Sequence, residues 1–305
     1  MARAHFGNSP LHPDLRPGKM VYISEPLYIC DLDGTLLRSD ATLSQFARDG
    51  LNLLIEAGAP LTVASARGTA GMRSVLAGVR LRLPVIELNG AFVSEPHSGR
   101  HLASSVLSAR DACAALAVIL STGVDPVLST WDGRRDRVHF GARSNDSISW
   151  YVEEKRRHRD PRLAPCKDLL AIARTEAVAQ ITTFTPDKGA PALTDRLARS
   201  IGTQSTVHSA ANMYLPGWTE ITIQHRAAEK GAAVPALLEA CNMSSAEVIA
   251  CGDHLNDLGL FAAATHTIAP ANAHPTVLKS AVEVVRSNDE DGVVRHLLDL
   301  HPGIE

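Results

Sequence analysis

Three features that would assign this sequence to a specialised class are absent from it. No apolar run approaches the roughly 20 residues that a membrane-spanning helix requires, and residues 1–26 lack the apolar middle of a signal peptide. The five cysteines are widely scattered, odd in number and free of the CxxC pairing that holds zinc. They predict reduced thiols, and we therefore expect a cytoplasmic protein with no membrane partner.

The sequence also lacks a large excess of charge of either sign. The 30 basic and 33 acidic residues leave a net charge of −3, and the pI is near 6.5. Because such a chain has no basic field to gather nucleic acid or an anionic membrane, we expect a small molecule as its partner instead. A chain of 305 residues, 45% of them hydrophobic, can bury a full core, and its length predicts two domains.

Short apolar strands alternate with helices near both ends of the chain. The helix after the first strand has Thr42 and Gln45 at capping-box spacing, and Gly58 with Pro60 predicts its end. Strands that alternate with helices predict an α/β fold with a parallel sheet. The predicted strands are 27–30, 61–64, 84–88, 248–251 and 282–285, and helices are predicted at 68–77, 256–264 and 293–300.

The middle of the chain has a different pattern. Hairpins are predicted at 91–103, with a turn at Ser98 and Gly99, and at 127–140, with a turn at Gly133. Hairpins interleaved with helices indicate an α+β module inserted into a discontinuous parallel-sheet core. The predicted parts are an irregular leader at 1–26, in which a short strand could form at 20–23, a core at 27–90 and 209–305, and an inserted domain at 91–208.

The first segment that suggests chemistry follows the first predicted strand. Asp31 and Asp33 stand two residues apart there, and Gly34 permits a tight turn before Thr35. One ionised carboxylate could attack phosphorus, while the other, with a raised pKa, could protonate the leaving oxygen. The pair alone is not specific, because metal-binding glycosyltransferases also use DxD and many such pairs are solvated turn residues.

Three further polar segments lie at strand ends or helix starts. Ser65 could donate a hydrogen bond to a phosphoryl oxygen, although taken by itself it is more readily explained as a helix N-cap. Lys230 could neutralise a nucleophile and a phosphate, although a lone lysine is usually a solvated charge. Asp253, Asn256 and Asp257 offer hard oxygen ligands that suit Mg²⁺, although such a loop could also cap a helix.

Together, in this order and spacing, the four segments resemble the haloacid dehalogenase-like phosphatases, whose motifs are DxDx[TV], a Ser or Thr, a Lys and an acidic pair. The finer similarity is to the Cof-like, type IIB branch, and it covers nearly all of the chain after the leader. It implies a Rossmann-like parallel-sheet core with an inserted α+β, C2B-type cap. The segments that match this branch are 88–91, 230–231, 252–257, 272–273 and 288–293.

Two segments depart from the pattern of that branch. Ser65-Ala66-Arg67 stands where the branch more often has TGR, so a hydroxyl is kept. Residues 225–229 stand where a Pro-Gly turn is more usual, which leaves the local loop open.

The resemblance implies a role for each matching residue. Asp31 would be the nucleophile and a Mg²⁺ ligand, and Asp33 would be the general acid and then base, with its backbone carbonyl on the metal. Asp253 would bind the metal directly, and Asn256 and Asp257 would complete its shell, directly or through water. The residues implied to hold the phosphoryl oxygens are Thr35, Ser65, the catalytic Lys230 and, beside the cap hinge, Asn89.

These features predict a Mg²⁺-dependent phosphatase that hydrolyses a small phosphorylated metabolite, such as a sugar phosphate, through a phosphoaspartate on Asp31. A phosphomutase or phosphotransferase is the nearest alternative, since the same phosphoaspartate could pass its phosphate to a sugar hydroxyl; phosphomannomutases share this cap type by resemblance. A binding protein that keeps the fold without turnover is the other alternative. The intact Asp31 and Asp33 argue against it.

Overall fold

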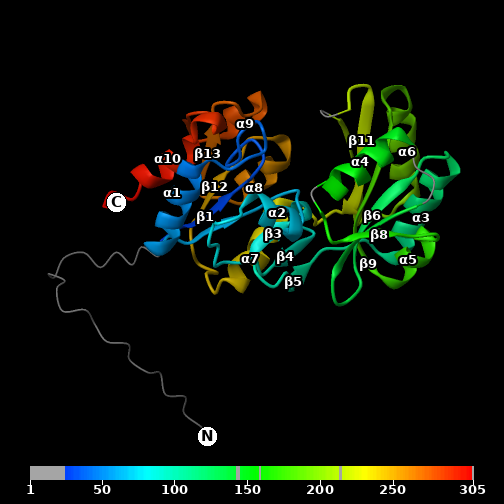
Figure 1. Ribbon diagram of the computed structural model, residues 1–305, viewed down its shortest axis with the longest axis horizontal. Coiled ribbons are helices and arrows are strands. Elements are labelled where there is room, and N and C mark those ends of the chain that lie inside the picture. Colours follow the sequence, from blue (N-terminus) through cyan, green and yellow to red (C-terminus); the bar gives the residue numbers. More distant parts are fainter. Residues whose placement is uncertain (1–24, 142–144, 158, 213–214, 304–305) are drawn as a thin grey trace, which may run out of the picture.

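The computed structural model describes residues 25–141, 145–157, 159–212 and 215–303. Figure 1 shows two α/β units side by side, a core formed by the two ends of the chain and an inserted unit formed by its middle. Most of the predicted leader, including the strand expected at 20–23, lies outside the described residues. Within the described ranges, no helix combines the length and the apolar character needed to cross a membrane.

The core is built on the predicted parallel sheet. β1 (Leu27–Cys30) lies at its centre, between β12 (Val248–Cys251) and β2 (Leu61–Val63). The strand order is β14-β13-β12-β1-β2, and β3 (Val85–Glu87) continues the sheet beyond β2 through an isolated parallel bridge. Because β1 and β12 are parallel neighbours, the residues that follow them meet at one edge of the sheet.

The other core elements follow in chain order. Those before the inserted unit are α1 (Gln45–Glu56), α2 (Thr69–Val75) and the 3-10 helix η1 (Leu88–Gly90). Those after it are α7 (Lys230–Ala240), η3 (Leu255–Asp257), α8 (Leu258–Ala262), β13 (His266–Pro270), α9 (Pro275–Ser280), β14 (Glu283–Val285), η4 (Asn288–Glu290) and α10 (Gly292–Asp299). The helix predicted at 256–264 is thus divided into η3 and α8.

Both faces of the sheet are covered because β1 sends alternate side chains to opposite sides. Tyr28 and Cys30 pack in the cluster that contains residues of α1 and α10, whereas Leu27 and Ile29 pack with residues of α7 and α8. A strand buried on both faces explains the unbroken apolar run that predicted it.

The start of α1 differs from the prediction. Its N-cap is Ser44, whose hydroxyl oxygen accepts the backbone N–H of Ala47 at 2.9 Å. The predicted capping pair of Thr42 and Gln45 is therefore wrong, because the Thr42 hydroxyl instead donates to Asp40 in the preceding turn.

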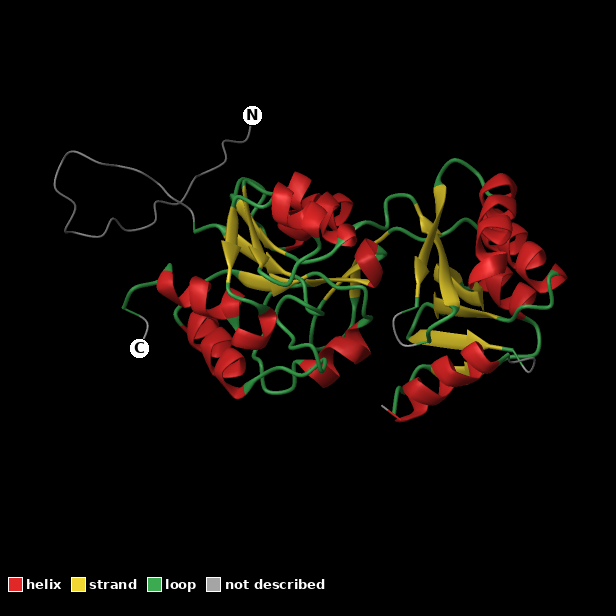
Figure 2. Cartoon of the chain, turned by 90° about the horizontal axis from the view of Figure 1, so that it is seen from above, coloured by secondary structure: helices red, strands yellow, loops and turns green. Residues whose placement is uncertain are grey.

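The inserted unit, which we call the cap, has a sheet with the strand order β10-β11-β9-β6-β7-β8. Its strands are β6 (Pro126–Trp131), β7 (Asp136–Phe140), β8 (Leu163–Pro165), β9 (Ala177–Pro186), β10 (Ser205–Ala211) and β11 (Trp218–His225). Its helices are α3 (Ala109–Ser121), α4 (Asp146–Arg157), α5 (Leu169–Thr175), η2 (Asp187–Gly189) and α6 (Ala190–Ser200). Figure 2 shows α3, α5 and α6 on the face of this sheet that is turned away from the core.

The boundaries of the cap differ from the prediction of 91–208. The first predicted hairpin is present, as β4 (Phe92–Ser94) and β5 (His101–Ser104), but it pairs with β3 of the core. The predicted return to the core after residue 208 is wrong, because it falls inside β10, and β11 still belongs to the cap sheet. We propose that the cap runs from the residue after β5 to the end of β11.

Candidate active site

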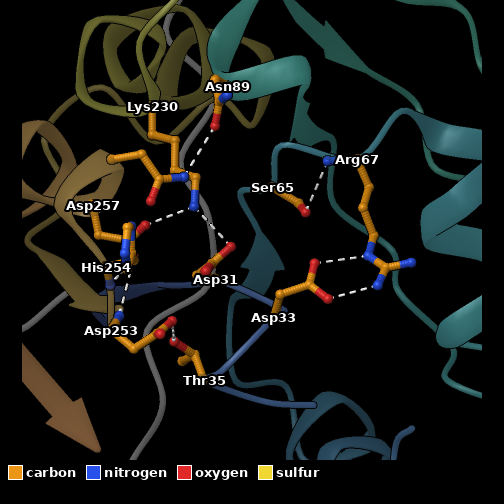
Figure 3. A network of polar contacts seen from close by, with 11 residues as sticks. Asp31, Asp33, Thr35, Ser65, Arg67, Asn89, Lys230, Asp253, His254 and Asp257 are labelled. Atoms are coloured by element: carbon orange, nitrogen blue, oxygen red, sulfur yellow. Dashed lines mark hydrogen bonds and ion pairs between the residues drawn. The ribbon is translucent and has the colours of Figure 1, made fainter. Parts of the chain in front are cut away.

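Side chains from three distant parts of the chain meet at the carboxyl edge of the core sheet (Figure 3). Asp31 directly follows β1, Asp253 follows β12, and Lys230 is the first residue of α7. The register pairs Cys30 with Cys251, so the next residues of both strands leave the sheet at the same level. Parallel neighbours therefore deliver these polar groups to one pocket, as the sequence predicts.

Lys230 is the centre of this pocket. Its ammonium Nζ lies 2.7 Å from Oδ1 of Asp31 and 2.6 Å from Oδ1 of Asp257, and the residue is only 1% exposed. Burial lowers the pKa of Lys230, but the charges of the two carboxylates outweigh burial and raise that pKa above its usual value. The lysine is therefore charged, and it is not the solvated surface cation that a lone lysine usually is.

Asp257 has a second function in the same loop. Its Oδ2 accepts the backbone N–H groups of Asp253 and His254, each at 3.0 Å. One carboxylate thus binds Lys230 and also fixes the loop after β12. Since Asp257 is completely buried, these bonds are its compensation for lost water.

Three carboxylates crowd around this single lysine. Oxygen atoms of Asp31, Asp253 and Asp257 lie within 4.8 Å of one another. Burial raises the pKa of Asp31 well above its usual value, with Lys230 opposing and Asp257 adding to the shift, and burial likewise raises the pKa of Asp253. The surplus of negative charge and the hard oxygen donors fit a divalent cation such as Mg²⁺.

Asp253 is also held from the side of the first strand. Its Oδ1 accepts the hydroxyl of Thr35 at 2.9 Å. The carboxylate lies directly against Gly34, whose φ of +80° is left-handed, and a Cβ at this position would overlap it. The glycine of the DxDGT segment is therefore required both by its backbone conformation and by the close approach of Asp253.

Asp33 does not point at Lys230. Arg67 grips it through two hydrogen bonds, 2.7 Å from Nε to Oδ2 and 2.6 Å from Nη2 to Oδ1 (Figure 3). The pair lies at the exposed side of the pocket, with 46% of the Asp33 side chain exposed. The sequence predicts no role for Arg67, whose only signal is its position two residues after Ser65.

Ser65 is fully buried beside this pair. Its Oγ accepts the backbone N–H of Arg67 at 3.1 Å, and its own N–H donates to Ile86 of β3. The N-cap of α2 is Gly68, so the alternative in which Ser65 caps this helix is wrong. Its hydroxyl proton remains available for another acceptor in the pocket.

The two residues after Asp253 that the sequence offers as metal ligands have different contacts. Asp257 joins the carboxylate cluster, whereas the side-chain nitrogen of Asn256 donates to Oδ1 of Asn89 at 3.1 Å. Asn89 has a left-handed φ of 55° at the start of the connection to the cap. The two asparagines therefore link the loop after β12 to the start of the connection to the cap.

The C-terminal matching segments support the first turn. Asn272 donates to the carbonyl of Gly34 at 2.8 Å and accepts the backbone N–H of Asn288 at 2.9 Å. Asn288 in turn donates to the carbonyl of Leu37 at 2.9 Å. These asparagines hold the turn that carries Asp31 and Asp33.

A parallel-sheet core with an acidic pocket at its carboxyl edge and a cap inserted in the chain defines a recognisable class of α/β enzyme folds. The family model described as haloacid dehalogenase-like hydrolase matches residues 28–297. The chain belongs to this family.

Known proteins resemble the chain over nearly its full length. The 5-amino-6-(5-phospho-D-ribitylamino)uracil phosphatase YwtE of Bacillus subtilis is 25% identical over 90% of this chain and 97% of its own. A haloacid dehalogenase-like hydrolase from Bacteroides thetaiotaomicron superposes with a TM-score of 0.74 at 23% identity, covering 91% of this chain and all of that one. The subclass IIB sugar phosphatase BT4131 superposes with a TM-score of 0.66 at 17% identity, covering 92% and 100%.

Proposed function

We propose that this protein is a Mg²⁺-dependent phosphatase that hydrolyses small phosphomonoesters, with Asp31 as the nucleophile. The observation that carries this proposal is the contact of 2.7 Å between Asp31 and the buried ammonium of Lys230. A carboxylate held beside a permanent cation can accept a dianionic phosphate that it would otherwise repel. Two relatives of similar length, YwtE and BT4131, are named as phosphatases, which supports the same class of reaction.

The proposed reaction has two steps. In the first, an Asp31 oxygen attacks phosphorus, the bond from phosphorus to the ester oxygen breaks, and Asp33 gives its proton to the leaving alcohol. In the second, Asp33 removes a proton from water, which attacks the phosphoaspartate and releases inorganic phosphate and the Asp31 carboxylate. The double contact with Arg67 fits the ionised Asp33 that acts as the base in the second step, because a protonated carboxyl cannot accept N–H groups at both oxygens while it donates its proton.

The surrounding residues would bind the phosphoryl group and the metal. Ser65, Asn89 and Lys230 would donate hydrogen bonds to the phosphoryl oxygens, the last with a full positive charge. The single hydroxyl proton of Thr35 is already donated to Asp253, so Thr35 would position that carboxylate. Asp31, Asp253 and Asp257 would hold Mg²⁺, with the backbone carbonyl of Asp33 beside them. When bound, the cation would neutralise the charge that develops on the phosphoryl oxygens.

The cap would determine the substrate specificity, because it would contact the part of the substrate that leaves as an alcohol. A sugar phosphate is our proposed substrate, because BT4131 is described as a sugar phosphatase and shares the cap arrangement. The phosphoaspartate could also be transferred to a second hydroxyl of the sugar, and that product would identify a phosphomutase.

The test is a panel of phosphorylated sugars and related metabolites, each incubated with the protein and Mg²⁺. We expect release of inorganic phosphate from some of them, no release with EDTA, and none from the Asp31→Asn variant. A phosphate that moves within a sugar without release would replace the phosphatase by a mutase. Neither release nor transfer across the panel would leave a binding protein as the better description.

A further inference from the structure

A second polar cluster lies between the core and the cap. The imidazole of His101, on β5, stands between two carboxylates: Nδ1 is 3.3 Å from Oε1 of Glu87, and Nε2 is 2.9 Å from Oδ1 of Asp136. The His101 side chain is only 6% exposed. None of these residues takes part in the pocket around Lys230, so the cluster needs another explanation.

The three residues come from three different parts of the fold. Glu87 is the last residue of β3 in the core, His101 lies in the hairpin that precedes the cap, and Asp136 is the first residue of β7 in the cap. Figure 1 shows β4 and β5 on the side of the core that faces the cap. A bond between His101 and Asp136 is therefore a bond across the junction of the two units.

Glu87 is itself fixed rigidly. It is completely buried, it accepts the backbone N–H of Thr69 at the start of α2, and it accepts the hydroxyl of Ser94 at 2.5 Å. The Ser94 oxygen also lies 2.7 Å from Nδ1 of His101. Glu87 and Ser94 of the core thus fix the position of the imidazole ring through their hydrogen bonds.

Aromatic rings from both units enclose the imidazole. Phe92 of β4 stacks on it with a centroid distance of 3.8 Å and an angle of 6°, and Trp131 of β6 meets it edge-on at 5.5 Å. Aromatic faces favour a cationic ring over a neutral one and keep water away from its ion pairs. The core supplies the stacked ring and the cap supplies the other.

The hydrogen-bond partners of its two nitrogens determine the charge of the His101 ring. The Ser94 hydroxyl donates its single proton to Glu87, so Nδ1 of His101 must donate to the Ser94 oxygen, while Nε2 must donate to the Asp136 carboxylate. A neutral imidazole has only one N–H donor, whereas an imidazolium has two. Burial lowers the pKa of His101, but hydrogen bonds and the charges of Asp136 and Glu87 raise it to about 9. At neutral pH the ring is therefore a cation between two anions.

Another charged group at this junction is Arg162 of the cap. Its guanidinium pairs with Asp160 at 2.8 Å and lies against Gly68, where a Cβ would overlap it. Gly68 follows Arg67 directly, so this contact touches the core beside the loop that carries Ser65. The cap thus rests on the core at two neighbouring polar points.

We propose that His101 is an ionic latch: as an imidazolium it ties Asp136 of the cap to Glu87 of the core and holds the cap at a fixed position over the active site. His101 acts on the proposed reaction only through the position of the cap. The inference does not need the proposed reaction to be correct, because the position of the cap can be measured without a substrate.

The first experiment needs no variant. The radius of gyration of the full chain is measured by small-angle scattering from pH 6 to pH 10, with circular dichroism to verify that the protein stays folded. We expect a constant value up to about pH 8 and an increase with its midpoint near pH 9. A radius that does not change while the protein remains folded would overturn the latch.

Variants then assign the transition to these residues. Asp136→Asn keeps an acceptor for His101 but removes its charge, so we expect the midpoint to move down by at least one pH unit. His101→Gln cannot carry a charge, and we expect an expanded protein at pH 7 and no pH transition. Asp132→Asn is the matched control, because Asp132 lies on the same β6–β7 hairpin but pairs with Arg137 within the cap.

Hydrogen exchange at pH 7 provides an independent measurement. Amides of the two connections, at residues 104–107 and 226–229, should exchange at least tenfold faster in Asp136→Asn than in the wild type and Asp132→Asn. Equal exchange in all three proteins would contradict the proposal. Stoichiometric Zn²⁺ binding that His101→Gln abolishes would also overturn it, because the same three side chains could then be metal ligands.

Discussion

At the residue scale, Lys230 determines the electrostatics of the pocket. A buried ammonium is tolerated because it has two carboxylate partners, and removing either partner leaves charge without compensation. Burial raises the pKa of Asp31, and the neighbouring ammonium of Lys230 opposes that shift and so favours the ionised carboxylate. The pocket is therefore one charged unit, and single substitutions in it will not have independent effects.

Replacing Asp31 tests the nucleophile directly. Asp31→Asn removes the attacking oxygen anion and keeps the size of the side chain, so we expect phosphate release to fall by at least about 10³-fold with the fold retained. Initial rates on the best substrate, together with circular dichroism, provide the measurement. The exposed Asp49, on α1, supplies a control in Asp49→Asn, and retained activity in Asp31→Asn would disprove the mechanism.

Replacing Gly34 tests the approach of Asp253. Gly34→Ala places an alanine in the left-handed backbone conformation of Gly34, which costs about 1–2 kcal/mol. The added Cβ would also displace the Asp253 carboxylate. Gly133→Ala is the matched control, because Gly133 has φ +91° but open space around it. We expect both variants to lose stability in urea unfolding, and only Gly34→Ala to weaken Mg²⁺ binding, by at least tenfold, in a calorimetric titration.

At the element scale, the strands that carry the site were the most predictable parts. β1 and β12 are buried on both faces, so each appears in the sequence as a short apolar run with an aspartate one or two residues after it, and both were predicted with their observed bounds. β11 was missed as a cap strand because its buried residues, among them Ile221 and Ile223, alternate with the half-buried Glu220 and Thr222. That alternation defines a strand but does not say which sheet it joins.

Pairings across the pocket were beyond prediction from sequence. The gathering of Asp31, Lys230, Asp253 and Asp257 follows from strand ends that share one edge, which a parallel sheet dictates. The grip of Arg67 on Asp33 depends instead on a side-chain rotamer and on the path of a loop. The same holds for the imidazole of His101, whose two partners are supplied by separate units of the fold.

The junction between β5 and β7 predicts how stability depends on pH. His101 has a folded-state pKa of about 9, above its ordinary value of 6.5, so the folded state binds its proton more tightly than the unfolded state does. Its stabilising contribution is complete below about pH 6.5 and is lost as the pH rises through about 9. We expect the difference in unfolding free energy between wild type and His101→Gln to shrink between pH 7 and pH 10, and a constant difference would refute this.

At the scale of the whole molecule, the metal would join segments from both ends of the chain. A ligand that binds only the folded state stabilises it by about 2.7 kcal/mol at one hundred times its dissociation constant. We therefore expect Mg²⁺ to raise the thermal midpoint of the wild type in differential scanning fluorimetry and EDTA to lower it. Asp253→Ala should abolish this response and Asp49→Asn should keep it; a response that survives in Asp253→Ala would place the ion elsewhere.

The interleaving of the core strands has a consequence for synthesis on the ribosome. Thr35 and Asp253 touch although 218 positions separate them, and β1 has no neighbour on one side until β12 has been made. The cap is continuous in the chain, so it can form its own hydrophobic core before β12 has been synthesised. The pairing of β1 with β12 joins residues distant in sequence, and such contacts form late. A nascent chain that stops before β12 would thus expose an apolar strand without a working pocket, and we expect chaperones to engage it during that interval.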